Sequence, residues 1–170
     1  MRYKNLLPEQ IWALREKVRN TKNPVLLAFY KHRYKKTMTL LGSFMPERAT
    51  FADMPAFPHG INGILVSGGA VIGSGCTIFH QVTIGSNLLE DTTNPGAPVI
   101  GDNVYIGAGA KIIGGIRVGN NVRIGANCVV VTDIPDNATV VLEKPKVILH
   151  DHPKNNVFVR YSQSRLGGAK

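Results

Sequence analysis

Cysteine, long hydrophobic runs and aromatic side chains are all scarce in this 170-residue sequence. Two cysteines, Cys76 and Cys128, are too few for a disulfide scaffold, so we expect free thiols. The apolar runs are only a few residues long, which argues against a transmembrane segment, and no charged-then-apolar leader opens the sequence. We therefore expect a cytoplasmic location. Aromatic residues make up 7% and are not interleaved with basic ones, which argues against nucleic-acid binding.

The net charge of +9 is concentrated at the two ends of the sequence. Residues 1–50 carry eleven Lys and Arg against three Asp and Glu, a net charge of +8, whereas residues 51–150 carry five against seven, a net charge of −2. The last twenty residues carry four against one. A basic end of this kind could meet phosphate groups, an anionic membrane surface or acidic subunits, but a solvated basic helix face is the simpler interpretation.

Glycine is abundant in the middle of the chain, and there the sequence repeats every six residues. Fifteen of the 18 glycines lie between Gly60 and Gly125. Val or Ile occupies ten positions with this spacing: Val66, Ile72, Ile78, Ile84, Ile100, Ile106, Ile112, Val118, Ile124 and Val130. The residue two positions before each of them is apolar and often small, and both cysteines fall in this set. Such self-similarity at a short fixed period is the signature of a repeat architecture.

A strict six-residue stripe excludes an amphipathic helix, whose apolar side chains recur with a period of 3.6. Short strands with a corner after every hexapeptide satisfy it, because alternation then points the aliphatic residue and the residue two before it inward. Glycine often follows the aliphatic residue, as at Gly101 and Gly107, and we expect it to supply the backbone angles of a tight corner. Three strands then close a triangular coil, and stacked coils pair their strands in parallel.

Two long segments resemble a known family. The runs HGINGILVSGGAVIGSGCTIFHQVTIGSN (59–87) and IGDNVYIGAGAKIIGGIRVGNNVRIGANCVVVTDIPDNA (100–138) resemble the catalytic half of serine O-acetyltransferases, and look closer still to the short relatives of these enzymes in polysaccharide-biosynthesis clusters. The resemblance covers roughly half of the chain and implies a left-handed parallel β-helix, whose hand the repeat alone does not determine. The expected fold class is mainly β, a hexapeptide solenoid with a short α-helical N-terminal segment.

The ends of the chain and one internal segment depart from the repeat. Apolar residues at helical spacing predict two helices within residues 1–50, which would form a basic cap. The β-helix is expected over residues 51–142, and residues 143–170 are expected to form a C-terminal tail. From Ile84 to Ile100 the step is sixteen residues, not a multiple of six, so a loop over 85–98 is predicted to leave the coil. In the resembled family this loop flanks the active-site cleft between neighbouring subunits.

Acetyl transfer from a thioester to a hydroxyl needs a base, and neutral imidazole suits that role near neutral pH. Of the five histidines, His59 matches the catalytic histidine of the family's H-x-x-G-I run, although here the run is one residue longer. His80 follows 21 residues later at an outward or corner position, and it could bind the acceptor or be the base instead. The resemblance also implies a carboxylate upstream that supports the base, for which Asp53 and Glu47 are the candidates.

The resemblance further implies acetyl-CoA as the acyl donor, with no metal ion. It places backbone contacts of the coenzyme near three residues at coil corners, and lysines near the end of the coil could meet its phosphates. The candidate coenzyme-binding residues are Gly85, Ser86, Gly107, Ala108, Lys111, Ala126, Lys144 and Lys146. Small residues at such positions would let the pantetheine arm lie against the edge of the coil.

The predicted function is an acetyl-CoA-dependent O-acetyltransferase whose small-molecule acceptor is a sugar or sugar nucleotide of capsule, exopolysaccharide or lipopolysaccharide biosynthesis. The family's acidic residue before the catalytic histidine is replaced here by Pro58, and its second histidine, which holds serine's carboxylate, would fall near Ala97. Serine O-acetylation in cysteine biosynthesis is the near alternative. More distant alternatives are a zinc-dependent hydratase, which would need three histidines on the coils where only two qualify, and a non-catalytic scaffold.

The solenoid is expected to assemble. About four triangular coils give a narrow domain with a thin core, so neighbouring subunits or caps must complete its burial. The resemblance implies a closed homotrimer in which two chains share each active site. Whether the N-terminal helices also join trimers into hexamers stays open.

Overall fold

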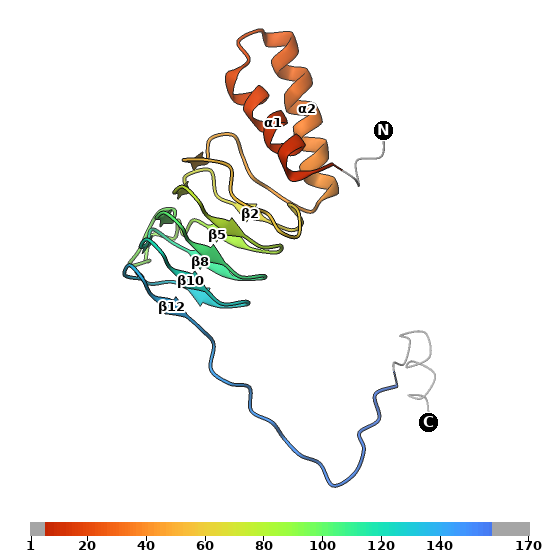
Figure 1. The fold of residues 1–170 in the computed structure, drawn as a ribbon, viewed down its shortest axis with the longest axis vertical. Coiled ribbons are helices and arrows are strands. Elements are labelled where there is room, and N and C mark those ends of the chain that lie inside the picture. The colour runs from red at the N-terminus through yellow and green to blue at the C-terminus, as the bar shows by residue number, and fades with distance from the viewer. Residues whose placement is uncertain (1–5, 158–170) are drawn as a thin grey trace.

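The structure, a computed structural model, describes residues 6–157 (Figure 1). Its N-terminal part is a pair of helices, α1 (Pro8–Asn20) and α2 (Pro24–Leu40), as the sequence predicts. Each helix has a proline in its first turn, where the missing N–H costs no intrahelical hydrogen bond. The Asn23 side chain accepts hydrogen bonds from two backbone N–H groups at the start of α2 and so fixes where that helix begins.

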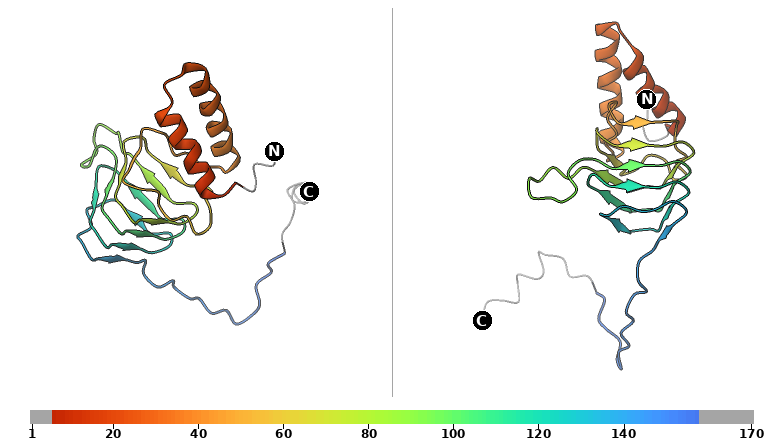
Figure 2. Two further views of the ribbon diagram at one scale, coloured as in Figure 1. Left: turned by 45° about the horizontal axis from the view of Figure 1, so that its top comes forward. Right: turned by 90° about the vertical axis from the view of Figure 1, so that its left-hand side faces the viewer.

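The rest of the described chain is a stack of triangular coils built from very short strands (Figures 1 and 2). The strands are β1 (Thr50–Phe51), β2 (Leu65–Val66), β3 (Val71–Ile72), β4 (Thr77–Ile78), β5 (Thr83–Gly85), β6 (Val99–Ile100), β7 (Tyr105–Ile106), β8 (Lys111–Ile113), β9 (Arg117–Val118), β10 (Arg123–Ile124), β11 (Val129–Val130) and β12 (Thr139–Val140). They form three parallel sheets, with strand orders β2-β5-β8-β11 (side one), β1-β3-β6-β9 (side two) and β4-β7-β10-β12 (side three). The chain passes from side one to side two to side three in every coil.

The register of the sheets confirms a coil of three hexapeptides. On side one, Leu65 pairs with Thr83 and Lys111 pairs with Val129, which is a step of 18 residues in both cases (83 − 65 and 129 − 111). Where the predicted loop intervenes, Thr77 pairs with Tyr105 across 28 residues (105 − 77), so the loop adds ten residues to one coil. The strands on either side of the loop therefore keep the same pairing as elsewhere.

The interior of the coil is the predicted aliphatic stack. All ten Val and Ile repeat positions are buried, and so are the ten residues two positions before them. Full burial of such a side chain contributes roughly 1.5–3 kcal/mol. Cys76 and Cys128 lie in this interior as free thiols, and desolvation raises the pKa of Cys76, which keeps that thiol protonated and unreactive.

The glycines after the aliphatic positions have a different role from the one expected. None of these glycines, among them Gly101 and Gly107, has a positive φ within the described chain; at several corners that conformation belongs to asparagines such as Asn121 and Asn127. A Cβ on Gly107 would lie 2.7 Å from the backbone nitrogen of Ala126 in the next coil. Glycine is therefore required there by the close stacking of successive coils, and the expectation of special backbone angles was wrong.

The two helices cover the N-terminal end of the solenoid (Figure 1). Arg15 of α1 is fully buried at this junction, and its guanidinium donates hydrogen bonds to the carbonyl oxygens of Ala49 and Glu47. The same guanidinium lies 4.9 Å from the ring centroids of both Trp12 and Phe51. Burial lowers the pKa of Arg15, a sign of the desolvation that these contacts offset.

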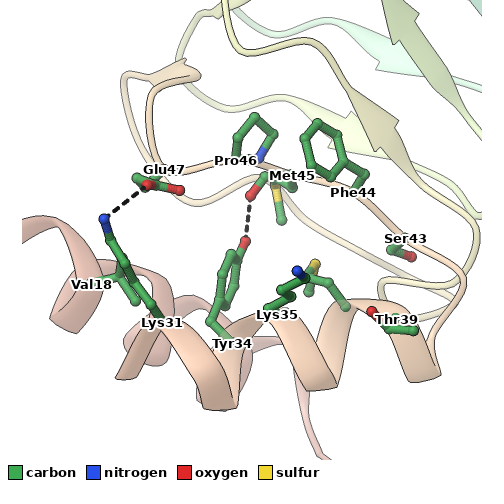
Figure 3. Close-up of a pocket in the computed structure, with 11 residues that line it drawn as sticks. Val18, Lys31, Tyr34, Lys35, Thr39, Ser43, Phe44, Met45, Pro46 and Glu47 are labelled. Atoms are coloured by element: carbon green, nitrogen blue, oxygen red, sulfur yellow. Dashed lines mark hydrogen bonds and ion pairs between the residues drawn. The ribbon is translucent and has the colours of Figure 1, made fainter. Parts of the chain in front are cut away.

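A second contact joins α2 to the segment that leads into the solenoid. The Tyr34 hydroxyl donates to the carbonyl oxygen of Met45 at 2.6 Å, and the Lys31 ammonium lies 3.8 Å from the Glu47 carboxylate (Figure 3). Burial raises the pKa of the Tyr34 hydroxyl, which therefore stays protonated as a donor. The helical pair and the first coil thus share one continuous core.

Two segments leave the coil. The loop between β5 and β6 projects from the side of the solenoid (Figure 2), and its ends are joined by reciprocal backbone hydrogen bonds between Asn87 and Gly96. After β12 the chain runs away from the solenoid in an extended, exposed form up to residue 157 (Figure 1). The remaining residues of the expected tail, 158–170, lie outside the described residues. Within residues 6–157 no helix is both long and apolar enough to cross a membrane.

Candidate active site

His59 and His80 meet at the corner between side three and side one. Their Nδ1 atoms are 2.9 Å apart, and their ring centroids are 4.9 Å apart with an angle of 41° between the ring planes. Two neutral imidazoles can approach this closely only if one nitrogen carries a proton and the other presents a lone pair. The structure thus brings together the two histidines that the sequence offered as alternative bases.

The backbone around the pair holds both rings in place. The Asn62 side chain donates to the carbonyl of His59, while the Asn62 carbonyl accepts from the backbone N–H of Gln81, next to His80. The extra residue in the histidine run lies between these contacts, where Gly60 has φ +70° and Gly63 has φ +65°. Phe79 packs edge-on against the His59 ring at 5.1 Å. Each histidine is therefore anchored by its neighbours in the chain.

A column of small residues continues from His80 along the solenoid. On side three Thr77 pairs with Tyr105, and Tyr105 pairs with Arg123. The residues three positions later, His80, Ala108 and Ala126, therefore lie at the same corner of three successive coils. Backbone hydrogen bonds from Gly109 to the His80 carbonyl, and from Asn127 to the Ala108 carbonyl, join the three corners. The corner therefore presents a histidine at one end and a strip of small side chains beyond it.

Lys111 lies beside this column. Its ammonium donates to the carbonyl oxygens of Gln81 and Gly109, at 3.0 and 2.6 Å. The lysine thereby brings a positive charge next to the histidine corner, and two of its three N–H donors are already used there.

Gly85 and Ser86 lie at the other end of β5, at the corner between side one and side two. There the Ser86 hydroxyl accepts a hydrogen bond from the Ser67 hydroxyl at 3.2 Å, and both serines line a shallow groove with Phe44 and Arg48. The candidate coenzyme residues are thus divided between two corners of the same chain.

The remaining candidates lie away from the histidine pair. Asp53 accepts hydrogen bonds from the backbone N–H of Gly75, and Glu47 is paired with Lys31 on the cap. Lys144 and Lys146 are exposed in the extended segment after β12. The structure therefore brings neither candidate carboxylate to His59, and it does not bring these two lysines to the small-residue column.

A polar hollow lies on side three, toward the corner with side two. It is lined by Gly75, Thr77, Asn103, Val104, Tyr105, Asn121 and Arg123. The Phe79 ring connects this hollow to the histidine pair, since it lies 5.1 Å from the His59 ring and 5.1 Å from the Tyr105 ring. Among residues 6–157 no group of three or more His, Cys, Asp or Glu side chains is arranged to hold a metal ion.

Sequence reasoning missed four residues in and near this site. Asn62 and Phe79 were not singled out, although the first stands one coil below His80 (80 − 62 = 18) and the second is its neighbour. Tyr105 and Arg123 were also missed, because strand residues that point outward carry no periodic signal. The spacing of 18 was the one signal that could have identified Asn62.

The comparisons with known proteins agree with this architecture. The family model described as "Bacterial transferase hexapeptide (six repeats)" matches residues 97–132. The serine acetyltransferase of Helicobacter pylori is 41% identical over 93 residues, which are 55% of this chain and 53% of the relative. For the serine acetyltransferase of Buchnera aphidicola the identity is 43% over 86 residues, 51% of this chain and 33% of the relative. The chain thus spans between a third and about half of the length of these serine acetyltransferases.

One relative matches over most of both chains. The putative colanic acid biosynthesis acetyltransferase WcaB of Escherichia coli is 34% identical over 137 residues, which are 81% of this chain and 80% of WcaB. Among solved structures, serine acetyltransferase from Neisseria gonorrhoeae in complex with serine has a TM-score of 0.62 at 31% identity, covering 81% of this chain and 55% of that one. Isoform 3 from Entamoeba histolytica in complex with cysteine has a TM-score of 0.65 at 27% identity, covering 85% and 51%.

These matches confirm the expected fold class, a left-handed β-helix preceded by helices. The repeat, the solenoid and the extended match to WcaB all lead to the same assignment. The chain belongs to the hexapeptide-repeat acetyltransferases of the serine acetyltransferase type.

Proposed function

We propose that this protein transfers an acetyl group from acetyl-CoA to a hydroxyl group of a sugar, with His59 as the general base. The observation that carries the chemistry is the histidine pair at the end of the small-residue column. His59 Nε2 takes the hydroxyl proton as the hydroxyl oxygen bonds to the thioester carbonyl carbon. The carbon–sulfur bond breaks, and the proton passes from Nε2 to the departing thiolate. Neither buried cysteine is needed, since no acyl-enzyme forms.

The column beyond His80 suits a long, narrow donor. Ala108 and Ala126 leave room for a pantetheine arm along the solenoid axis, and the Lys111 ammonium stands beside it as a positive charge. Backbone N–H groups near the corner would meet the developing charge on the carbonyl oxygen.

A sugar acceptor is supported by two observations. The match to WcaB, a putative colanic acid biosynthesis acetyltransferase, extends over four-fifths of both chains, whereas the serine acetyltransferases match over about half of their length or less. The hollow on side three, with the Phe79 ring between its Tyr105 and the histidine pair, offers the half-exposed Tyr105 ring, on which a sugar ring can stack, and the exposed Arg123, which can pair with a phosphate. The acceptor is therefore a sugar that carries a phosphate, such as a sugar nucleotide.

Serine is the second candidate acceptor. It is favoured by the higher identity to serine acetyltransferases over the solenoid, and by solved relatives that hold serine or cysteine. Thiol release from acetyl-CoA should be followed with a panel of sugar nucleotides and with L-serine. We expect saturable turnover with a sugar nucleotide. In Arg123→Ala the KM for the sugar nucleotide should rise, while the KM for acetyl-CoA should not change. Efficient saturable turnover with L-serine alone would reject the sugar acceptor.

The divided coenzyme residues support a shared site in a homotrimer. A donor lying along the column at the corner of His80 does not reach Gly85 and Ser86 at the next corner of the same coil, but a neighbouring copy can present them. Three copies around a three-fold axis close such contacts. Co-expressed His59→Ala and Ser86→Trp subunits, each inactive alone, should then regain part of the activity in mixed trimers. A fully active monomer in light scattering would reject this assembly.

A further inference from the structure

We propose that His80 is a positioning residue for His59: its Nδ1 accepts a hydrogen bond from the Nδ1–H of His59 and thereby keeps the Nε2 of His59 unprotonated and basic. This inference rests on the acetyl transfer proposed above and names how its base is oriented. It is carried by the 2.9 Å contact between the two Nδ1 atoms.

The contact allows two proton arrangements, and they have opposite consequences. If His59 donates, its Nδ1 carries the proton and its Nε2 has the lone pair that a base requires; His80 then carries its own proton on Nε2. If His80 donates, His59 carries its proton on Nε2 and has no lone pair to offer there. Only the first arrangement is compatible with His59 as the base.

Neighbouring backbone and ring contacts hold the His59 and His80 side chains close to each other. Asn62 joins the two histidine segments, because its side chain holds the His59 carbonyl and its carbonyl holds the Gln81 N–H. The His80 carbonyl accepts from Gly109 of the next coil. On the other flank Phe79 packs edge-on against the His59 ring, which limits its rotation.

His80 fills the role that a carboxylate usually has beside a catalytic histidine. The candidate carboxylates are engaged elsewhere, Asp53 by the Gly75 N–H and Glu47 by Lys31. A neutral imidazole orients the base without adding a negative charge to the site. It can also stabilise the imidazolium that forms on His59, because His80 Nδ1 still accepts when His59 carries both protons.

The test replaces His80 by three residues of different acceptor strength. His80→Phe keeps a ring but removes the hydrogen-bond acceptor. We expect kcat to fall by about tenfold to hundredfold, with the KM for acetyl-CoA unchanged. This loss is smaller than the fall of about 10²–10⁴-fold expected when the base itself is removed. His80→Asn places an amide oxygen near the position of Nδ1 and should recover most of the loss. His80→Asp places a carboxylate acceptor there, the usual orienting partner of a catalytic histidine, and should also recover most of the loss.

A purely structural role for His80 would not make the recovery of kcat depend on the presence of an acceptor at this position. Equal losses of kcat in His80→Phe, His80→Asn and His80→Asp would overturn the proposal. Thermal unfolding and light scattering of each variant identify loss of kcat through misfolding, and His150→Phe in the exposed extended segment is the matched control for the substitution itself.

A tautomer measurement separates this proposal from the proposed function. Long-range ¹H–¹⁵N spectra of the ¹⁵N-labelled protein, with His59→Ala and His80→Phe for assignment, should show neutral His59 as the Nδ1–H tautomer and neutral His80 as the Nε2–H tautomer. That result supports the hydrogen bond even if no tested acceptor is acetylated. The reverse tautomers, together with full loss of activity in His80→Ala and little in His59→Ala, would overturn it and make His80 the base.

Discussion

Replacement of Arg15 by alanine tests whether one buried side chain fixes the helical cap to the solenoid. Arg15 is fully buried, donates to two backbone carbonyls and contacts both the Trp12 and the Phe51 ring, which also pack edge-on against each other. Loss of a charge-assisted hydrogen bond costs about 1.5–3 kcal/mol, and a desolvated cation–π contact adds up to about 2 kcal/mol. Part of this gain offsets the desolvation that lowers the pKa of Arg15. With the cavity included, Arg15→Ala should lower the free energy of unfolding by about 3–5 kcal/mol.

Two variants calibrate this estimate. Arg15→Met keeps most of the volume but leaves the carbonyl oxygens of Ala49 and Glu47 without their donor, so its loss should be about 1–3 kcal/mol. Arg19→Ala removes an exposed arginine that is 3.4 Å from Glu16, and its loss should stay below about 1 kcal/mol. Urea unfolding followed by fluorescence of Trp12, the single tryptophan, reports directly on this junction. Equal midpoints for Arg15→Ala and Arg19→Ala would refute the reasoning.

Three further outcomes are expected. His59→Ala should lower kcat by about 10²–10⁴-fold with the affinity for acetyl-CoA retained, as measured by thiol release, while His150→Ala changes neither; normal turnover in His59→Ala would remove it as the base. Gly107→Ala should destabilise the solenoid by at least about 1–3 kcal/mol in urea titrations, since its Cβ would meet the backbone of Ala126 at 2.7 Å; an unchanged midpoint would show that the coils can separate. Prolonged treatment with EDTA should leave acetyl transfer unchanged, and loss of activity that Zn²⁺ restores would favour the metal-dependent alternative.

The architecture was predictable because each coil repeats one local solution. The Val and Ile positions at six-residue spacing predicted both the triangular cross-section and the buried positions, and the sixteen-residue step from Ile84 to Ile100 predicted the loop. The role of glycine was not predictable in the same way. Whether Gly107 is present for its backbone angles or for the absence of a Cβ depends on the distance to the next coil, which the sequence does not state.

The site was predictable only in part, since it depends on where corners of different coils meet. The sequence identified His59 and His80 as alternatives but not as partners, because their spacing of 21 residues is three more than one coil and says nothing of how their rings turn. The sequence did not single out Arg15, because the basic residues of the first fifty were interpreted together as a solvated helix face. Its burial follows from the docking of α1 on Phe51, a contact between segments with no common pattern.

The loop between β5 and β6 is an insertion that leaves the strand pairing of the solenoid unchanged. Val71 pairs with Val99 in the same manner as Val99 pairs with Arg117, although 28 residues separate the first pair and 18 the second. The aliphatic stack therefore tolerates the ten extra residues of the loop, whereas a residue inserted within a strand would rotate the inward side chains outward. A loop of another length or composition can therefore be grafted between β5 and β6 while the paired strands and the buried core keep their places.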